Sequence, residues 1–376
     1  MTSEIQKYLE ASEKMMSSSE RKWLMRPFRD GDEEGILELC KAVYPGRQYH
    51  REQWMKWWQW MYRDNPSGKG SIWLAEHDGK IVGQYPLIFI QMKVGNEIIK
   101  VCENIDLMTH PDYRHQGMFA ALERHALDEM GKQGIHITIG FPNEIAYPGH
   151  KKSGWFDIDT MRPVLKPLDW RDALRIRISN GFVVMLGALA GNLVGGVFYR
   201  GRKTPVVEGL TIAQVSRFDE RVDHFWAKVS HQYQIMTVRN REYLNWRYAN
   251  APDVEYLIYV AEREAAVSGY LVLRLMQMKQ TSVAMIFDIL AESGEIAQCL
   301  IAEAMERCTQ EKVDLVYYAS IAGSSVAKAF GRNGFIFVPF VRSLRFCAYS
   351  SSSNISKEFL QKPDNWLVQM GDSDMM

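Results

Sequence analysis

The amino-acid sequence repeats itself at a fixed spacing, and this repeat limits the folds that the chain can adopt. A shift of 186 residues, which places Trp60 on Trp246, aligns the two halves without a gap over one long stretch. Bulky, turn-forming and strand residues then agree in both halves: Tyr62 with Tyr248, Pro66 with Pro252, Ile72 with Ile258, Ala75-Glu76 with Ala261-Glu262, and Gly83 with Gly269. Residues of these kinds define a packed scaffold, so the repeat predicts two copies of one α/β (α+β) fold. A chain of 376 residues is also long enough for two hydrophobic cores.

The hydrophobic pattern of the first half predicts a strand, two helices, and then strands that alternate with helices. His77-Asp78-Gly79 lies between two apolar strands and predicts a hairpin. We expect strands at 23–28, 71–76, 80–92, 98–109 and 135–140. We expect one helix that starts after residue 32, and further helices at 52–62, 117–130 and 145–153. The helix at 52–62 is rich in tryptophan, which favours core packing or, for Trp57 or Trp58, an aromatic wall beside a substrate.

Charge and cysteine usage narrow the class of protein. The 45 basic and 45 acidic residues balance, whereas a general nucleic-acid binder has a basic excess, so no nucleic-acid partner is expected. The five cysteines lack a C-x-x-C pair, which predicts free thiols, no metal site and a cytoplasmic protein. We expect a flexible arm at 1–20, a first domain at 21–168, an apolar linker helix region at 169–207 and a second domain at 208–376.

The apolar segment at 181–199 lies inside this linker region. It has basic residues on both sides and glycines spaced four apart, at Gly187, Gly191 and Gly195. That spacing gives a helix one smooth face for close packing. The run is near the lower length limit for a bilayer span, so we favour a buried helix between domains. Contact with a membrane surface stays open as the alternative, and so does self-association into a homo-oligomer.

One segment of the first half, 105–119, carries the features of a binding site. An apolar strand runs into His110-Pro111, and a helix then starts at Gly117. Free backbone N–H groups at a helix N-terminus, together with the helix dipole, favour an anion. Gly117 allows a ligand to approach the backbone closely. A diphosphate fits such a turn better than a carboxylate, because it can use more of the amides.

This turn resembles the signature of the GNAT superfamily of acetyl-CoA-dependent N-acetyltransferases: Arg or Gln, two residues, Gly, one residue, then Gly or Ala. The chain reads Arg114-His115-Gln116-Gly117-Met118-Phe119, and Phe119 departs from the pattern by crowding the turn or by packing inward. The resemblance implies that these amides bind the diphosphate of acetyl-CoA, used as a co-substrate. It further implies that the backbone of Leu107-Met108-Thr109 lines the pantetheine arm, and that each domain has a mixed, mostly antiparallel sheet flanked by helices.

A second pattern about thirty residues downstream strengthens the resemblance. The family often shows Asn, two residues, Ala, three residues, Tyr, three residues and Gly-Phe; here Asn143, Ala146, Gly154 and Trp155 take these positions. The family tyrosine often protonates the leaving thiolate, and His150 stands in its place. The resemblance therefore implies a cofactor contact for Asn143 and a proton donor at His150, against the alternative of a solvent-facing histidine. Imidazole donates protons readily near neutral pH.

Two carboxylates of the central strand are candidates for the general base. Asp106 recurs in the second half as Asp288, where the cofactor signature is missing, which favours a structural role for Asp106. Glu103 is therefore the preferred catalytic base. A chain of water molecules as the base, with Glu103 as a hydrogen-bonded strand residue, stays open as the alternative. The second half has Glu292 and Glu295 where the glycine-led turn would lie, and negative charge there disfavours a diphosphate.

The resemblance implies an N-acetyltransferase that moves an acetyl group to an amine of a small molecule, amino sugar or peptide by direct attack. Its second domain is a degenerate copy that lacks the cofactor signature. Two other hypotheses stay open. One is a catalytically weak acyl-CoA-binding or assembly protein, and the other is an aminoacyl-transferase-like enzyme.

Overall fold

The computed structural model describes residues 22–168, 204–278, 281–321, 325–337 and 344–374. The predicted N-terminal arm at 1–20 and the apolar segment at 181–199 lie outside these ranges. Among the described helices, none is both long and apolar enough to cross a membrane.

The described residues divide into two compact units, and neither unit is one continuous stretch of sequence. The first unit holds the described residues up to Ile90, together with Lys100–Phe156 and Cys347–Asn354. The second unit holds Gln91–Ile99, the described residues between Asp157 and Phe346, and those from Ile355 onward. A short segment late in the chain is therefore built into the first unit. The expected domain limit at 168 borders residues that the structure does not describe, and the limit at 208 lies within the described range that starts at residue 204.

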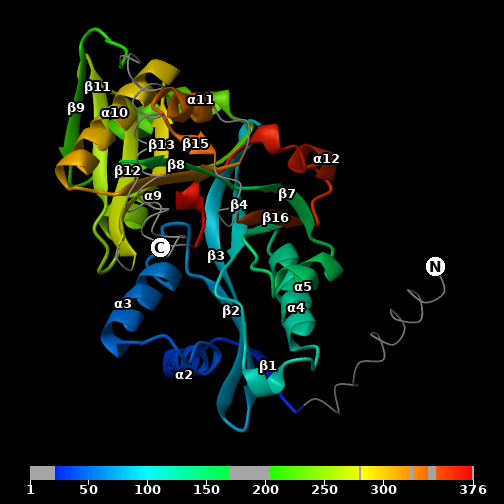
Figure 1. Cartoon of the computed structure of the whole chain (residues 1–376). Coiled ribbons are helices and arrows are strands. Elements are labelled where there is room, and N and C mark those ends of the chain that lie inside the picture. Colours follow the sequence, from blue (N-terminus) through cyan, green and yellow to red (C-terminus); the bar gives the residue numbers. More distant parts are fainter. Residues whose placement is uncertain (1–21, 169–203, 279–280, 322–324, 338–343, 375–376) are drawn as a thin grey trace. The chain divides into compact units, whose positions relative to one another are not determined.

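The first unit is an α/β structure whose strands lie in the order β1-β2-β3-β4-β6-β16 (Figure 1). The parallel pair is β4 with β6, whereas β1–β2, β2–β3 and β6–β16 are antiparallel. The elements are β1 Leu24–Pro27, α2 Glu33–Val43, α3 Arg51–Tyr62, β2 Ser71–His77, β3 Lys80–Val94, β4 Glu97–Asn104, β5 Met108–Thr109, η1 Pro111–Tyr113, α4 Met118–Lys132, β6 Ile137–Gly140, α5 Tyr147–Lys152 and β16 Arg345–Ser350.

Helix α4 covers one face of this sheet because its apolar residues repeat at helical spacing. Its buried side chains, which include Met118, Leu122 and Ala126, pack with strand residues of β2, β3 and β4 in one cluster. Met118 lies directly over Gly83 of β3, where a Cβ atom would collide with the Met118 sulfur. The start of α4, and with it the turn before the helix, is therefore fixed against the sheet.

The second unit contains a sheet in the order β15-β8-β14-β13-β12-β11-β9, mostly antiparallel, with β13 and β14 parallel. Helix α10 packs on β11–β13 (Figure 1). The elements are β7 Phe156–Thr160, β8 Arg162–Pro167, β9 Leu210–Val215, α8 Arg221–Val229, η2 Ser230–Gln232, β10 Ile235–Thr237, α9 Arg241–Leu244, η3 Asn245–Ala249, β11 Leu257–Arg263, β12 Ala266–Met278, β13 Thr281–Ala291, α10 Gly294–Gln310, β14 Leu315–Ser320, α11 Ser325–Arg332, β15 Ile336–Phe337, α12 Lys357–Leu360, η4 Pro363–Asn365, β17 Trp366–Leu367 and η5 Met370–Asp372.

The hairpins of the two units confirm the sequence repeat. The shift of 186 residues places β2 on β11 end for end, and Lys80, the first residue of β3, on Ala266, the first residue of β12. Each hairpin also has a register shift at the matching position, between Ala75 and Glu76 in one and between Ala261 and Glu262 in the other. The duplicated fold is thus visible down to a single bulge, and the mixed, mostly antiparallel sheets agree with the expected class.

One predicted element is wrong in its extent. The expected strand at 98–109 is interrupted, because β4 ends at Asn104 and β5 contains only Met108–Thr109. Asp106 lies between them with φ of 49°, a left-handed conformation that a strand cannot contain.

Candidate active site in the first unit

The break in the central strand leaves a backbone edge that no other described strand pairs. Up to Asn104, β4 pairs with β6, and Asn104 lies opposite Gly140. After the break, β5 pairs with β3, with Thr109 opposite Gly83 and Met108 opposite Gln84. After the break the chain thus stays paired with β3 and moves away from β6, so β5 and β6 diverge. An unpaired edge of this kind can accept an extended ligand as if it were another strand.

This edge leads directly into the turn at 110–117. Two left-handed residues, His115 with φ of 62° and Gly117 with φ of 72°, bring the chain from η1 to the first turn of α4. The amide of Ala121 donates to the Gly117 carbonyl at 3.1 Å, and the amides before it lie in the first helical turn, where intrahelical acceptors are lacking. The geometry is that of a backbone anion site.

The side chains of the turn divide into two groups. Arg114 and His115 are exposed, whereas the Gln116 amide donates to the Asp112 carbonyl at 3.3 Å and stabilises the turn from within. The Asp112 amide donates to the His110 imidazole, also at 3.3 Å. The main-chain amides of this turn are therefore the donors that it offers to an anion, and the exposed Arg114 is a positive charge beside them.

Phe119 packs inward, away from the backbone of the turn. Its ring fills the space beside Gly149, where an added Cβ would lie 2.6 Å from the ring. The ring also meets the imidazole of His150 edge to face, with centroids 5.1 Å apart. The two departures from the family pattern, Phe119 and His150, thus contact each other, and Gly149 makes room for both.

His150 is buried, with 3% of its surface exposed, so the alternative of a solvent-facing histidine is wrong. Its Nδ1 lies 2.5 Å from Oε1 of Glu123, and the Tyr85 hydroxyl donates to the same oxygen at 3.2 Å. Trp155 packs against the imidazole at 4.4 Å between centroids. Burial, followed by the charge of Glu123, raises the pKa of the Tyr85 phenol, which stays protonated and donates.

Glu123 and Tyr85 are site residues that the sequence analysis missed. Glu123 is fully buried on the apolar face of α4, between Leu122 and Ala126. A carboxylate at such a position requires a buried partner, and this was the signal in the sequence.

The remaining predicted site residues occupy separate places in the first unit. Asn143 is exposed, and its side-chain oxygen accepts from the amides of Ile145 and Ala146, at 2.9 Å each, just before α5. Glu103 is buried on β4, with 5% exposed. Of the cofactor residues on the strand edge, Met108 is buried, and Leu107 and Thr109 are half-buried.

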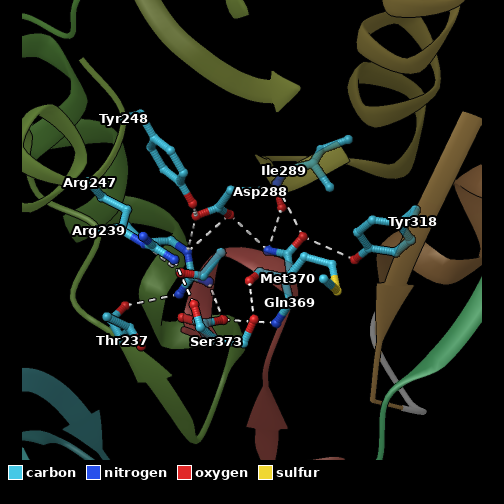
Figure 2. A network of polar contacts seen from close by, with 12 residues as sticks. Thr237, Arg239, Arg247, Tyr248, Asp288, Ile289, Tyr318, Gln369, Met370 and Ser373 are labelled. Carbon is cyan, nitrogen blue, oxygen red and sulfur yellow. Dashed lines mark hydrogen bonds and ion pairs between the residues drawn. The ribbon is translucent and has the colours of Figure 1, made fainter. Parts of the chain in front are cut away.

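In the second unit the corresponding divergence of strands is closed by the unit's own chain. The parallel pairing of β13 with β14 ends at Ile286 opposite Tyr318. Beyond it, the Gln369 side chain takes both hydrogen bonds of the Ile289 backbone, accepting from its amide at 3.1 Å and donating to its carbonyl at 3.0 Å (Figure 2). The backbone edge that is unpaired in the first unit is thus hydrogen-bonded to Gln369 in the second.

Comparisons with known proteins agree with this geometry. Residues 25–156 match the family described as acetyltransferase (GNAT) domain. None of the curated proteins matches the sequence. Among the described residues, no group of His, Cys, Asp or Glu side chains has the arrangement of a metal site.

Solved structures with low sequence identity share the fold over most of both chains. A GCN5-related N-acetyltransferase from Anabaena variabilis is 13% identical, with a TM-score of 0.58 over 86% of this chain and 72% of its own. A probable N-acyltransferase from Enterococcus faecalis is 11% identical, with a TM-score of 0.62 over 87% and 72%. An N-myristoyltransferase from Saccharomyces cerevisiae, with bound myristoyl-CoA and inhibitors, is 11% identical, with a TM-score of 0.59 over 96% and 87%.

These likenesses span both units, so the duplicated architecture is a fold found in other proteins. Residues 25–156 match the acetyltransferase (GNAT) domain family, and the likeness in fold to the solved structures extends over the second unit.

Proposed function

We propose that the chain is an N-acyltransferase that moves an acetyl group from acetyl-CoA to an amine of a small molecule, an amino sugar or a peptide. The observation that carries the proposal is the continuity of two features in the first unit. The unpaired edge at Leu107–Thr109 runs directly into the turn whose amides open the helix α4. A CoA thioester has the matching parts, namely an extended amide-containing arm and a diphosphate.

The amides of residues 114–119 bind the diphosphate, and the edge at 107–109 pairs with the arm. Gly117 at the start of α4 keeps this approach free of a side chain. The arrangement directs the thioester carbonyl toward the strand break, where a backbone N–H can stabilise the oxyanion of the tetrahedral intermediate.

His150 protonates the leaving thiolate in this proposal. Glu123 holds one imidazole nitrogen, which fixes the ring and leaves the other nitrogen to exchange a proton. The pair is enclosed by Phe119 and Trp155, and a site that excludes water strengthens such interactions. Glu103 is the base that the sequence pattern favours, and Asp106 is the other carboxylate on the same stretch.

The identity of the acyl group is tested with a panel of acyl-CoA donors. The yeast enzyme that shares the fold was solved with myristoyl-CoA, so a donor panel runs from acetyl-CoA to long-chain acyl-CoA. The acceptor panel contains polyamines, amino sugars and peptides with free amino groups. The readout is thiol release, with the acylated product identified by mass spectrometry.

The decisive variant is Gly117→Asp, with Gly79→Asp as its matched control. The two glycines have nearly the same φ, 72° and 73°, and Gly79 has open space around it. Both substitutions therefore add the same charge in the same backbone conformation. At Gly117 the carboxylate repels the diphosphate, so we expect KM for acyl-CoA to rise at least about tenfold, or about 1.4 kcal/mol. Gly79→Asp leaves KM unchanged.

Equal KM values for the two variants contradict this assignment of the cofactor site. Saturable acyl-CoA binding without thiol release on any acceptor would instead favour the binding or assembly protein.

A further inference from the structure

The duplication places the same tyrosine–aspartate pair in both units. In the first unit the Tyr62 hydroxyl donates to Oδ2 of Asp106 at 3.0 Å. In the second, the Tyr248 hydroxyl donates to Oδ2 of Asp288 at 3.1 Å. The tyrosines correspond under the shift of 186 residues, and each aspartate lies two residues beyond the last parallel pairing of its central strand: Asp106 in the break after β4, and Asp288 within β13. The groups that surround Asp288 in the second unit therefore indicate what kind of group can bind to Asp106 in the first.

In the second unit the aspartate is paired with a cation. Arg239 donates through Nε to both oxygens of Asp288, at 3.1 and 3.0 Å, and through Nη2 to Asp372 at 2.7 Å (Figure 2). Gln369 donates to Asp288 at 2.9 Å. Arg239 has no exposed surface, and a buried carboxylate requires such a counter-charge.

In the first unit, no cationic side chain among the described residues pairs with Asp106 as Arg239 pairs with Asp288. The shift that relates the tyrosines places Arg239 on Gln53, an exposed neutral residue of α3. Among the residues that the structure describes, Tyr62 is the one hydrogen-bond donor to the Asp106 carboxylate. Asp106 is half-buried, whereas Asp288 is buried, with 1% of its surface exposed.

The position of Asp106 is held by the backbone. The Gln84 side chain donates to the Asp106 carbonyl at 2.8 Å, and φ of 49° turns the residue out of the strand. The next residue is Leu107, which begins the edge assigned to the thioester arm. A group bound at the Asp106 carboxylate is therefore within one or two residues of that arm, at about 3.5 Å per residue.

We propose that the Tyr62–Asp106 pair binds the protonated amine of the acceptor and takes its proton, in the place that Arg239 occupies against Asp288. This inference rests on the proposed function and names its acceptor class: a primary amine that is cationic at neutral pH. Trp57 lies edge-on to Tyr62, with centroids 6.2 Å apart, and adds an aromatic face favourable to a cation.

The reaction needs one group that takes a proton from the amine and one that gives a proton to the thiolate, and Asp106 and His150 fill these roles. The ammonium gives one proton to the Asp106 carboxylate, and the neutral nitrogen attacks the thioester carbonyl. The C–N bond forms, the C–S bond breaks, and the sulfur leaves as a thiolate that takes a proton from His150. The nitrogen passes its remaining extra proton to His150, which restores the imidazole, and Asp106 releases the proton that it took to solvent, so one proton is released per turnover.

The environment of Asp106 suits a base that works near neutral pH. Burial raises the pKa of its carboxyl, and the Tyr62 hydrogen bond and the charge of Arg47 offset part of that rise. Tyr49 and Cys40 also interact with its charge, and burial raises the pKa of both, to about 12 for Cys40. Both neighbours stay neutral, so Arg47 is the charged group that acts on Asp106 among the described residues.

The experiment uses Asp106→Asn with Asp78→Asn as its matched control. Both aspartates have φ of 49°, and asparagine tolerates this conformation, so neither change strains the backbone. Asp78 is exposed in the hairpin turn. We expect Asp106→Asn to lower kcat/KM for the amine by about 10²- to 10⁴-fold and to remove the ascending limb of its pH profile. The Kd for acyl-CoA stays within about twofold, and Asp78→Asn resembles the wild type.

Each outcome separates this inference from the proposed function. If the wild type neither binds acyl-CoA nor releases thiol, the proposed function fails. If the wild type is active and Asp106→Asn keeps its kcat/KM and its pH profile, the assignment of Asp106 is overturned. The same holds if Glu103→Gln, and not Asp106→Asn, removes the ascending limb, because Glu103 is then the base.

Discussion

At the scale of single residues, the first unit combines a buried histidine–glutamate pair with a partly exposed aspartate. His150 and Glu123 satisfy each other in a buried place, whereas Asp106 has a single hydroxyl donor and partial access to solvent. Buried charge needs a partner, so the two arrangements have different consequences when a residue is changed. We therefore expect substitution at His150 to affect both stability and turnover, and the two effects must be separated.

A double substitution separates them. His150→Phe leaves the Glu123 carboxylate buried without its partner, so we expect a loss of about 3–5 kcal/mol in the free energy of unfolding. Adding Glu123→Leu removes that charge and restores most of the stability, while turnover stays low because no proton donor remains. Urea denaturation and steady-state kinetics measure the two quantities. A double variant that regains both would show that His150 is structural only.

The pH dependence of the reaction follows from the direction of the Asp106 shift. A base works in its deprotonated form, and burial raises the pKa of this carboxyl. The ascending limb of kcat/KM against pH is therefore expected above the ordinary carboxyl pKa of about 4. A limb at the ordinary value, or a profile unchanged in Asp106→Asn, would contradict the assignment.

At the scale of elements, α4 and α5 are joined by the close contact of Phe119 with Gly149. An added Cβ on Gly149 meets the Phe119 ring at 2.6 Å, so Gly149→Ala should destabilise the protein by about 1–3 kcal/mol. Because the obstacle is one ring, Phe119→Leu in the same chain should recover part of the loss. Thermal unfolding of the two single variants and the double variant gives the coupling. If the destabilisations of the two single variants simply add in the double variant, Phe119 and Gly149 do not interact.

The sequence predicts those elements that depend on local pattern. The hairpin around Asp78-Gly79, the helix that begins at Gly117 and the short helix before Gly154 all lie where composition and spacing indicated. The strand break at Asp106 was missed, because a left-handed aspartate leaves no local hydrophobic signal. Glu123 on the apolar face of α4 does give a local signal, but its partner His150 is 27 residues away and cannot be identified from local pattern.

At the scale of the whole molecule, long-range pairings complete each unit and could not be derived from local pattern. Cys347–Ser350 of β16 pairs with β6 of the first unit, and β8 pairs with β14 of the second. The closing role of Gln369 likewise joins residues 80 positions apart, at Ile289. Nothing in the composition of the C-terminal segment indicates that it fills the place where the first unit has an open edge.

The buried network around Arg239 should dominate the stability of the second unit. Arg239→Gln leaves Asp288 and Asp372 without their counter-charge, so we expect a loss of about 3–5 kcal/mol in the free energy of unfolding. Arg263→Gln, at an exposed position, is the control and should change little. Urea denaturation followed by tryptophan fluorescence measures both. A loss below about 1 kcal/mol for Arg239→Gln would mean that the network is not required as described.

The central claim is that the amides at 114–119 and the edge at 107–109 bind a CoA thioester. The most direct measurement is a crystal structure of the protein with acetyl-CoA. We expect the diphosphate on the backbone amides at the start of α4, the pantetheine arm along Leu107–Thr109, and no CoA beside Gln369 in the second unit. A turn that stays empty at saturating acetyl-CoA, or CoA bound in the second unit instead, would contradict it.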